Sequence, residues 1–141
     1  MLSVLGQLLG TEGYRDVRRR PEARTFPGLL IWRVGGDLFF ASVGQMEAAL
    51  KNSLAEIRPP IKHVLLDMSS VNFIDVSACD DLITFIKQLQ SRDVSIAFAH
   101  VRDTVRQDMQ LGKIDAVVGS ADFYERITDG VCAWQRREPC S

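Results

Sequence analysis

The stretch Lys62–Leu82, with the sequence KHVLLDMSSVNFIDVSACDDL, decides the fold. Its first part contains a short apolar run, which is typical of a strand buried on both faces. Its second part predicts the start of a helix, with Ser77 as the N-cap and Asp80 three positions later, as in a capping box. The polar corner between the two parts would lie at the carboxyl end of a strand, where α/β proteins commonly place ligands and switches.

On both sides of this stretch, strands and helices alternate. The turn Gly35-Gly36-Asp37 joins two apolar runs, so we expect a β-hairpin there. The units after the hairpin predict an α/β fold, with a mixed, mostly parallel sheet covered by about four α-helices. The predicted strands are Leu29–Val34, Leu38–Ser42, Val64–Met68, Ser95–Ala99 and Ala116–Val118, and the predicted helices are Val43–Ile57, Ser77–Gln90, Arg102–Leu111 and Asp122–Arg137.

The composition excludes several classes of protein. A chain of 141 residues with 46% apolar residues and a net charge of −1 is typical of one globular domain, and it lacks the basic excess of a nucleic-acid-binding protein. Three cysteines without CxxC spacing and two histidines predict neither a disulfide framework nor a metal site. No pattern of a nucleophile beside a base is visible, so we do not expect an enzyme.

Six short segments carry a resemblance to a known family. They are Gly13–Asp16, Phe26–Ile31, Leu38–Ser42, Val64–Asp67, Phe73–Ser77 and Ile96–Val101. Together they resemble the C-terminal STAS domain of bacterial, in particular actinobacterial, SulP (SLC26-type) anion permeases. The resemblance covers residues 10–135, which is nearly the whole chain.

The resemblance implies a STAS-type fold and a non-catalytic regulatory domain at the cytoplasmic face of a sulfate or anion transporter. On this basis we expect a membrane-proximal linker at residues 1–13, the STAS domain at 14–137 and a C-terminal tail at 138–141. The implied partners are the transmembrane domain of the parent transporter and a second STAS domain. The alternative is a free-standing phospho-switch protein similar to the anti-sigma-factor antagonists.

Two roles remain open for Ser77. In the antagonist branch of the resemblance, the matching serine is phosphorylated and precedes a glycine, whereas Ala78 follows it here. The carboxylates of Asp75, Asp80 and Asp81 would also repel a phosphate at this position. We therefore interpret Ser77 as a helix cap and keep the phosphoacceptor as the alternative.

The resemblance also implies binding of GTP, GDP or ATP, although no cofactor is required. No phosphate-binding loop is visible, because Gly112-Lys113 is followed by Ile114 rather than serine or threonine. Polar residues near the predicted strand ends are the candidates for an anion site, with ordinary loop polarity as the alternative. These candidates are Ser42, Gly44, Ser69, His100 and Arg102.

A basic arm precedes the first predicted strand. It contains Arg15, Arg18, Arg19 and Arg20. Such a run is commonly only a solvated segment, but basic residues beside a membrane also attract anionic lipid headgroups. The sequence therefore leaves lipid binding as a second interpretation of this arm.

Overall fold

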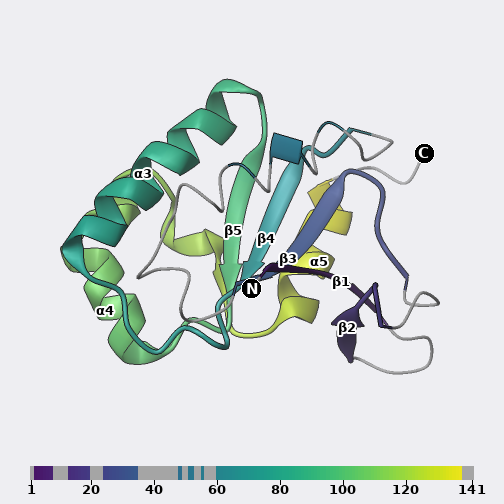
Figure 1. Ribbon diagram of the computed structural model, residues 1–141, viewed down its shortest axis with the longest axis horizontal. Coiled ribbons are helices and arrows are strands. Elements are labelled where there is room, and N and C mark those ends of the chain that lie inside the picture. The colour runs from purple at the N-terminus through teal and green to yellow at the C-terminus, as the bar shows by residue number, and fades with distance from the viewer. Residues whose placement is uncertain are drawn as a thin grey trace.

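The computed structural model describes residues 2–7, 13–19, 24–34, 48, 51–52, 55 and 60–137 (Figure 1). These residues form a six-stranded sheet in the order β2-β1-β3-β4-β5-β6. The strands from β3 to β6 are parallel, and β1 runs antiparallel to both of its neighbours. The bounds are β1 Leu2–Gln7, β2 Tyr14–Asp16, β3 Leu29–Val34, β4 His63–Asp67, β5 Ser95–Ala99 and β6 Phe123–Tyr124.

Strand β4 is buried along its whole length. Successive side chains of a strand point to opposite faces, so a continuously apolar strand needs cover on both faces. Val64 and Leu66 belong to the core on one face, and Leu65 belongs to the core on the other. The prediction of an α/β fold with a mixed, mostly parallel sheet is confirmed.

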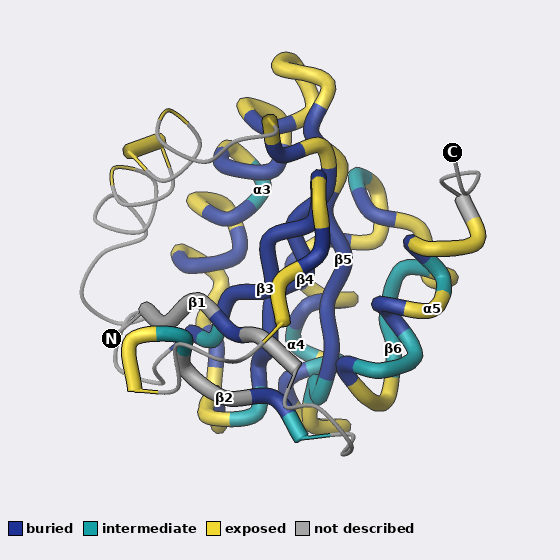
Figure 2. The backbone as a smooth tube through the Cα atoms, turned by 90° about the vertical axis from the view of Figure 1, so that its right-hand side faces the viewer, coloured by how far each residue is buried: buried dark blue, intermediate teal, exposed yellow. Residues whose placement is uncertain are grey.

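Three described α-helices supply this cover (Figure 2). Helices α3 (Val76–Ser91) and α4 (Asp103–Leu111) pack against one face of the sheet, and α5 (Ile127–Arg137) packs against the other. The face of α3 that meets the sheet carries a continuous apolar stripe. Its fully or nearly fully buried residues are Ala78, Cys79, Leu82, Phe85, Ile86 and Leu89.

The prediction of a strand at Ala116–Val118 is wrong. Residues Ile114–Ala116 form a 3₁₀ turn, which is closed by the amide of Val117 donating to the carbonyl of Ile114. The last strand is instead β6, where Phe123 stacks on Phe98 of β5 with ring centroids 5.1 Å apart. A second 3₁₀ turn, Ser120–Asp122, and then β6 precede the final helix. This helix therefore begins at Ile127 rather than at Asp122.

The N-terminal segment contributes to the sheet. Part of the predicted linker, Leu2–Gln7, forms β1 between β2 and β3, and Leu5 is 1% exposed. The second hairpin strand, Leu38–Ser42, lies outside the described residues, and the described antiparallel neighbour of β3 is β1. Most of the predicted helix Val43–Ile57 also lies outside them, although Ala48, Lys51, Asn52 and Ala55 are helical and exposed.

Helices α3 and α4 meet at a close contact between Gly112 and Cys79. A Cβ built on Gly112 would lie 2.5 Å from both Cβ and Sγ of Cys79. Cys79 is fully buried in the first turn of α3, and Gly112 caps the end of α4. Only glycine therefore lets the end of α4 approach the start of α3 this closely.

We expect Gly112→Ala to lower the free energy of unfolding by about 1–3 kcal/mol, because the added methyl group overpacks the contact with Cys79. Gly119→Ala is the matched control, since the nearest atom to its added Cβ is 4.0 Å away. That control should change stability by less than about 0.5 kcal/mol. Urea unfolding of both variants measures the difference, and equal stability would contradict the proposed contact.

Candidate functional site

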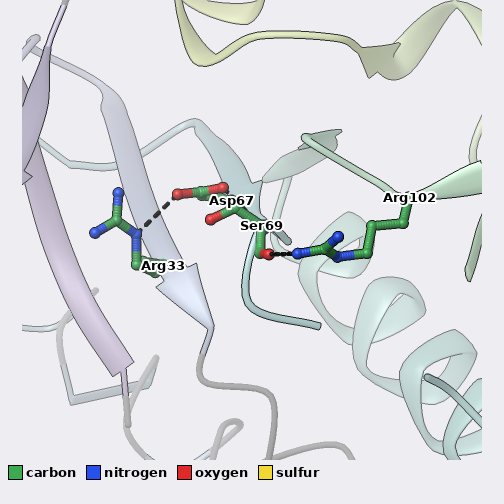
Figure 3. A network of polar contacts seen from close by, with 4 residues as sticks. All are labelled: Arg33, Asp67, Ser69 and Arg102. Carbon is green, nitrogen blue, oxygen red and sulfur yellow. Dashed lines mark hydrogen bonds and ion pairs between the residues drawn. The ribbon is translucent and has the colours of Figure 1, made fainter. Parts of the chain in front are cut away.

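The candidate site begins with a half-buried ion pair at the carboxyl ends of β3 and β4. Asp67 is the last residue of β4 and has no exposed surface. It lies opposite Arg33 of β3 in the parallel register, and Arg33 Nε donates to Asp67 Oδ2 over 2.9 Å (Figure 3). A buried carboxylate without a charged partner would be strongly destabilising, so this pair accounts for an acidic residue in the core.

A chain of hydrogen bonds leads from this pair across the strand ends. The second carboxylate oxygen, Asp67 Oδ1, accepts a bond from the backbone N–H of Ser69 over 3.0 Å. The carbonyl of Ser69 in turn accepts a bond from Arg102 Nη2 over 3.2 Å. Figure 3 shows Arg33 and Arg102 approaching this short segment from opposite sides. We call the four residues the strand-end network; it joins β3, the loop after β4 and the start of α4.

The structure divides the predicted set of anion-binding residues. Ser69 and Arg102 are brought together, through the backbone oxygen of Ser69. Ser42 and Gly44 lie outside the described residues. His100 takes a left-handed conformation with φ of 57°, and its amide donates to the carbonyl of Tyr124 over 3.2 Å.

His100 is joined through its backbone to β6, just before α5, and not to the strand-end network. Arg126 hydrogen-bonds to Asp129 over 3.0 Å and lowers the pKa of that carboxyl below its usual value, and His100 adds a smaller effect in the same direction. His100 therefore lies close to the first turn of α5. Among the described residues, no hydrogen bond links His100 to Ser69 or Arg102.

Helix α3 begins with a different cap from the one predicted. Its N-cap is Asp75, whose side chain accepts a bond from the N–H of Ala78 over 2.7 Å. The prediction of Ser77 as the cap is wrong, and Ser77 instead lies exposed in the first turn. Aspartate is as favourable a cap as serine, and the earlier start adds the backbone bond from Cys79 N to Asp75 O.

The remaining candidate groups offer little chemistry. Burial raises the pKa of the Cys79 thiol to about 11, helped by the carboxylates of Asp108, Asp80 and Asp75, so the thiol stays protonated and poorly nucleophilic. Within the part of the chain that the structure describes, no group of three histidine, cysteine or acidic residues could hold a metal ion.

The basic arm is described only in part. Arg18 and Arg19 are exposed in the turn after β2, and Arg15 lies on β2 opposite Gly6 of β1. Arg20 lies outside the described residues. Three of the four arginines are thus described, one on an edge strand of the sheet and two in the turn that follows it.

Sequence reasoning missed Arg33 as a member of the strand-end network. Its partner Asp67 was visible as a carboxylate at the end of an apolar run, which is a signal for a buried ion pair. Arg33 is 34 positions away from Asp67 in the sequence, so only the register of β3 against β4 identifies the pair.

Comparison with known proteins identifies sequence relatives. The family model described as "STAS domain" matches residues 20–130. The chain is 28% identical over 139 residues to the chloroplastic sulfate transporter 4.1 of Arabidopsis thaliana, covering 92% of this chain and 20% of that protein. It is 24% identical to a probable sulfate transporter of Mycobacterium tuberculosis, covering 96% of this chain and 24% of that protein. The chain thus spans a fifth to a quarter of these relatives.

Solved structures share the fold. The murine Slc26a9 anion transporter aligns with a TM-score of 0.83 at 21% identity, over 96% of this chain and 22% of that one. The SulP transporter STAS domain of Vibrio cholerae aligns with a TM-score of 0.68 at 18% identity, over 84% of this chain and 91% of that one. The anti-sigma factor antagonist SpoIIAA aligns with a TM-score of 0.60 at 14% identity, over 83% and 94% of the two chains. Among the described residues, no helix has the length and apolar character needed to cross a membrane.

We expect Asp75→Ala to lower the free energy of unfolding by about 1 kcal/mol, because it removes the side chain that caps α3. Ser77→Ala should change it by less than about 0.5 kcal/mol, because Ser77 is exposed and is not the cap. Chemical unfolding of both variants makes the comparison. A larger loss for Ser77→Ala than for Asp75→Ala would refute this assignment of the cap.

Proposed function

Since this chain belongs to the STAS domain family, we propose that it is the regulatory domain of a SulP-type sulfate or anion transporter. The observation that carries the proposal is the match of nearly the whole chain to one part of several sulfate transporters. In this role the domain lies at the cytoplasmic face of the membrane. Its main partner is the transmembrane domain of the same transporter.

We further propose that the domain acts by contact and not by catalysis. The buried groups that might react are already engaged: Asp67 is paired with Arg33, and the Cys79 thiol stays protonated. The parallel sheet is covered by helices on both faces, so partners would meet the domain at exposed helix surfaces, loops and strand ends. These surfaces suit recognition of a neighbouring domain.

Within this role, we propose that an anionic ligand such as GTP or ATP binds beside Arg102. Arg102 is exposed at the start of α4, close to the loop after β4, and its guanidinium can donate several hydrogen bonds to phosphate oxygens. The negative charge of Asp67 is offset by Arg33, which lowers its repulsion of an anion at the strand ends. This position matches the usual ligand-binding edge of an open α/β sheet.

The basic arm offers a second contact with the membrane. Exposed Arg18 and Arg19 would attract anionic lipid headgroups by about 1 kcal/mol for each residue near the surface. A contact with a second STAS domain is also compatible with this role.

The alternative is a free-standing phospho-switch protein. The exposed hydroxyl of Ser77, which is not used as a cap, favours this alternative. The acidic residues on both sides oppose it, because a phosphate at Ser77 would face Asp75 and Asp80. The two functions differ in whether Ser77 carries phosphate in the cell.

The decisive experiment measures anion flux through the parent transporter in vesicles, with and without residues 2–141. We expect removal of the domain to change the transport rate while the order of preference among anions stays the same, because the domain contributes no part of the permeation path. Flux must be normalised to the amount of transporter in the membrane. An unchanged rate at equal amounts would refute the regulatory role.

Titration with labelled GTP and ATP tests the proposed anion site. We expect Arg102→Ala to weaken binding about tenfold or more, because the loss of a charge-assisted hydrogen bond costs about 1.5–3 kcal/mol. Arg92→Ala is the control. Arg92 is exposed at the C-terminal end of α3, before β5 begins, whereas Arg102 follows the end of β5. Equal binding by both variants, or no saturable binding by the unaltered protein, removes the site.

A further inference from the structure

Exposed apolar side chains gather where α3 begins. Within the described residues, three large apolar side chains are exposed, namely Phe73 at 45%, Val76 at 70% and Leu111 at 79%. Single exposed apolar residues are common on soluble proteins and need no explanation, whereas a group of them indicates a contact surface. The question is therefore whether these three lie together.

The contact between Gly112 and Cys79 brings the backbone beside Leu111 close to the start of α3, where Phe73 and Val76 lie. Gly112 directly follows Leu111, and a Cβ on Gly112 would lie 2.5 Å from Cys79. Val76 lies one helical turn before Cys79, and Phe73 lies three residues before Val76. Figure 1 likewise shows the end of α4 beside the start of α3. We call this surface the acidic corner. It consists of Phe73, Val76 and Leu111 with the carboxylates of Asp75, Asp80, Asp81 and Asp108.

The charges at this corner are mostly negative. Asp75 caps α3 through the N–H of Ala78, and Asp80 directly follows Cys79 in the same helix. The backbone carbonyl of Asp108 lies 3.8 Å from Cys79 Sγ, so this residue of α4 also lies beside the start of α3. Asp81 adds another exposed carboxylate, and the sequence from Val71 to Ile86 contains no lysine, arginine or histidine. Two basic residues lie along or just after α4. Lys113 is exposed beside Gly112, and the charge of Arg106 is offset by Asp115, with which it pairs over 2.8 Å.

We propose that the acidic corner docks a Lys/Arg-bearing cytoplasmic loop of the transporter's membrane domain. This inference rests on the proposed function, because it needs a membrane domain beside the chain. Cytoplasmic loops of membrane proteins carry an excess of lysine and arginine. Such a loop would place its cations against the aspartates and its apolar side chains against Val76 and Leu111.

Two other occupants fit the corner less well. The cytoplasmic surface of a membrane is itself negative, so it repels four clustered carboxylates. A symmetric contact between two copies would place each acidic corner against its twin, and like charges facing each other are destabilising. A basic loop satisfies both the charge and the apolar surface.

The test uses the full-length transporter in membranes, with the photo-crosslinking amino acid p-benzoylphenylalanine at Val76 or Leu111. Both positions are exposed, so the substitutions leave the core intact. We expect crosslinks that mass spectrometry assigns to a Lys/Arg-bearing cytoplasmic loop. The same amino acid at Lys87, which is exposed farther along α3, is the control and should give few or none.

A charge reversal tests the role of the carboxylates. We expect Asp80→Lys to lower the crosslinking yield from position 111 at least about fivefold, because it places like charges across the contact. Glu125→Lys is the matched control, since Glu125 is exposed before α5, outside the corner. Exchange of a loop lysine for aspartate should restore the yield in the Asp80→Lys variant.

Each other outcome overturns the proposal. Crosslinks to a second copy of this chain, to lipid or to no protein would show that a basic loop does not occupy the corner. A yield that is indifferent to Asp80→Lys would show that charge does not hold the contact. These failures leave the proposed function standing if removal of the domain still alters flux. An unchanged flux refutes the proposed function itself.

Discussion

Burial of strand β4 on both faces is the constraint on which the rest of the structure depends. Its five residues have almost no exposed surface, and its three apolar residues divide between two separate apolar cores, Val64 and Leu66 on one face and Leu65 on the other. Neither core can form unless helices lie on both sides of the sheet, which requires the parallel, crossover-connected strands on either side of β4. The positions of α3, α4 and α5 follow from this requirement, and so do the positions of the loops at the strand ends.

The same burial explains why the polar residues of the strand ends are so fully engaged. Asp67 completes a buried strand, so its carboxylate has no access to water and must be satisfied by Arg33 and by the N–H of Ser69. This arrangement fixes the first residues of the loop that leads to α3. The loop is fixed a second time by its apolar residues, since Val71 and Ile74 are buried in the core. Its ordered shape therefore comes from polar contacts at one end and packing along its length.

Sequence patterns predicted the elements whose stabilisation is local or continuous, and they failed where a distant partner decides. Strand β4 and helix α3 were visible as an apolar run and an amphipathic period. Strand β6 was not, because its two residues depend on the stacking of Phe123 on Phe98, 25 positions earlier. The cap of α3 was misassigned because Asp75 and Ser77 are both suitable caps and only packing selects between them. The partner of Asp67 depends on strand register, which no local pattern encodes.

The strand-end network and the acidic corner lie at the two ends of one short loop. Ser69 contacts Arg102 at the first end, and Asp75 caps α3 at the second. Since Val71 and Ile74 anchor the loop between them, a ligand beside Arg102 and a partner at Val76 would contact one connected segment. Any coupling between two such sites is reciprocal, so an anion that favours one arrangement of the loop would alter partner affinity by the same factor that the partner alters anion affinity. Coupling of this kind needs no chemical step, because it requires only a difference in binding free energy between two states.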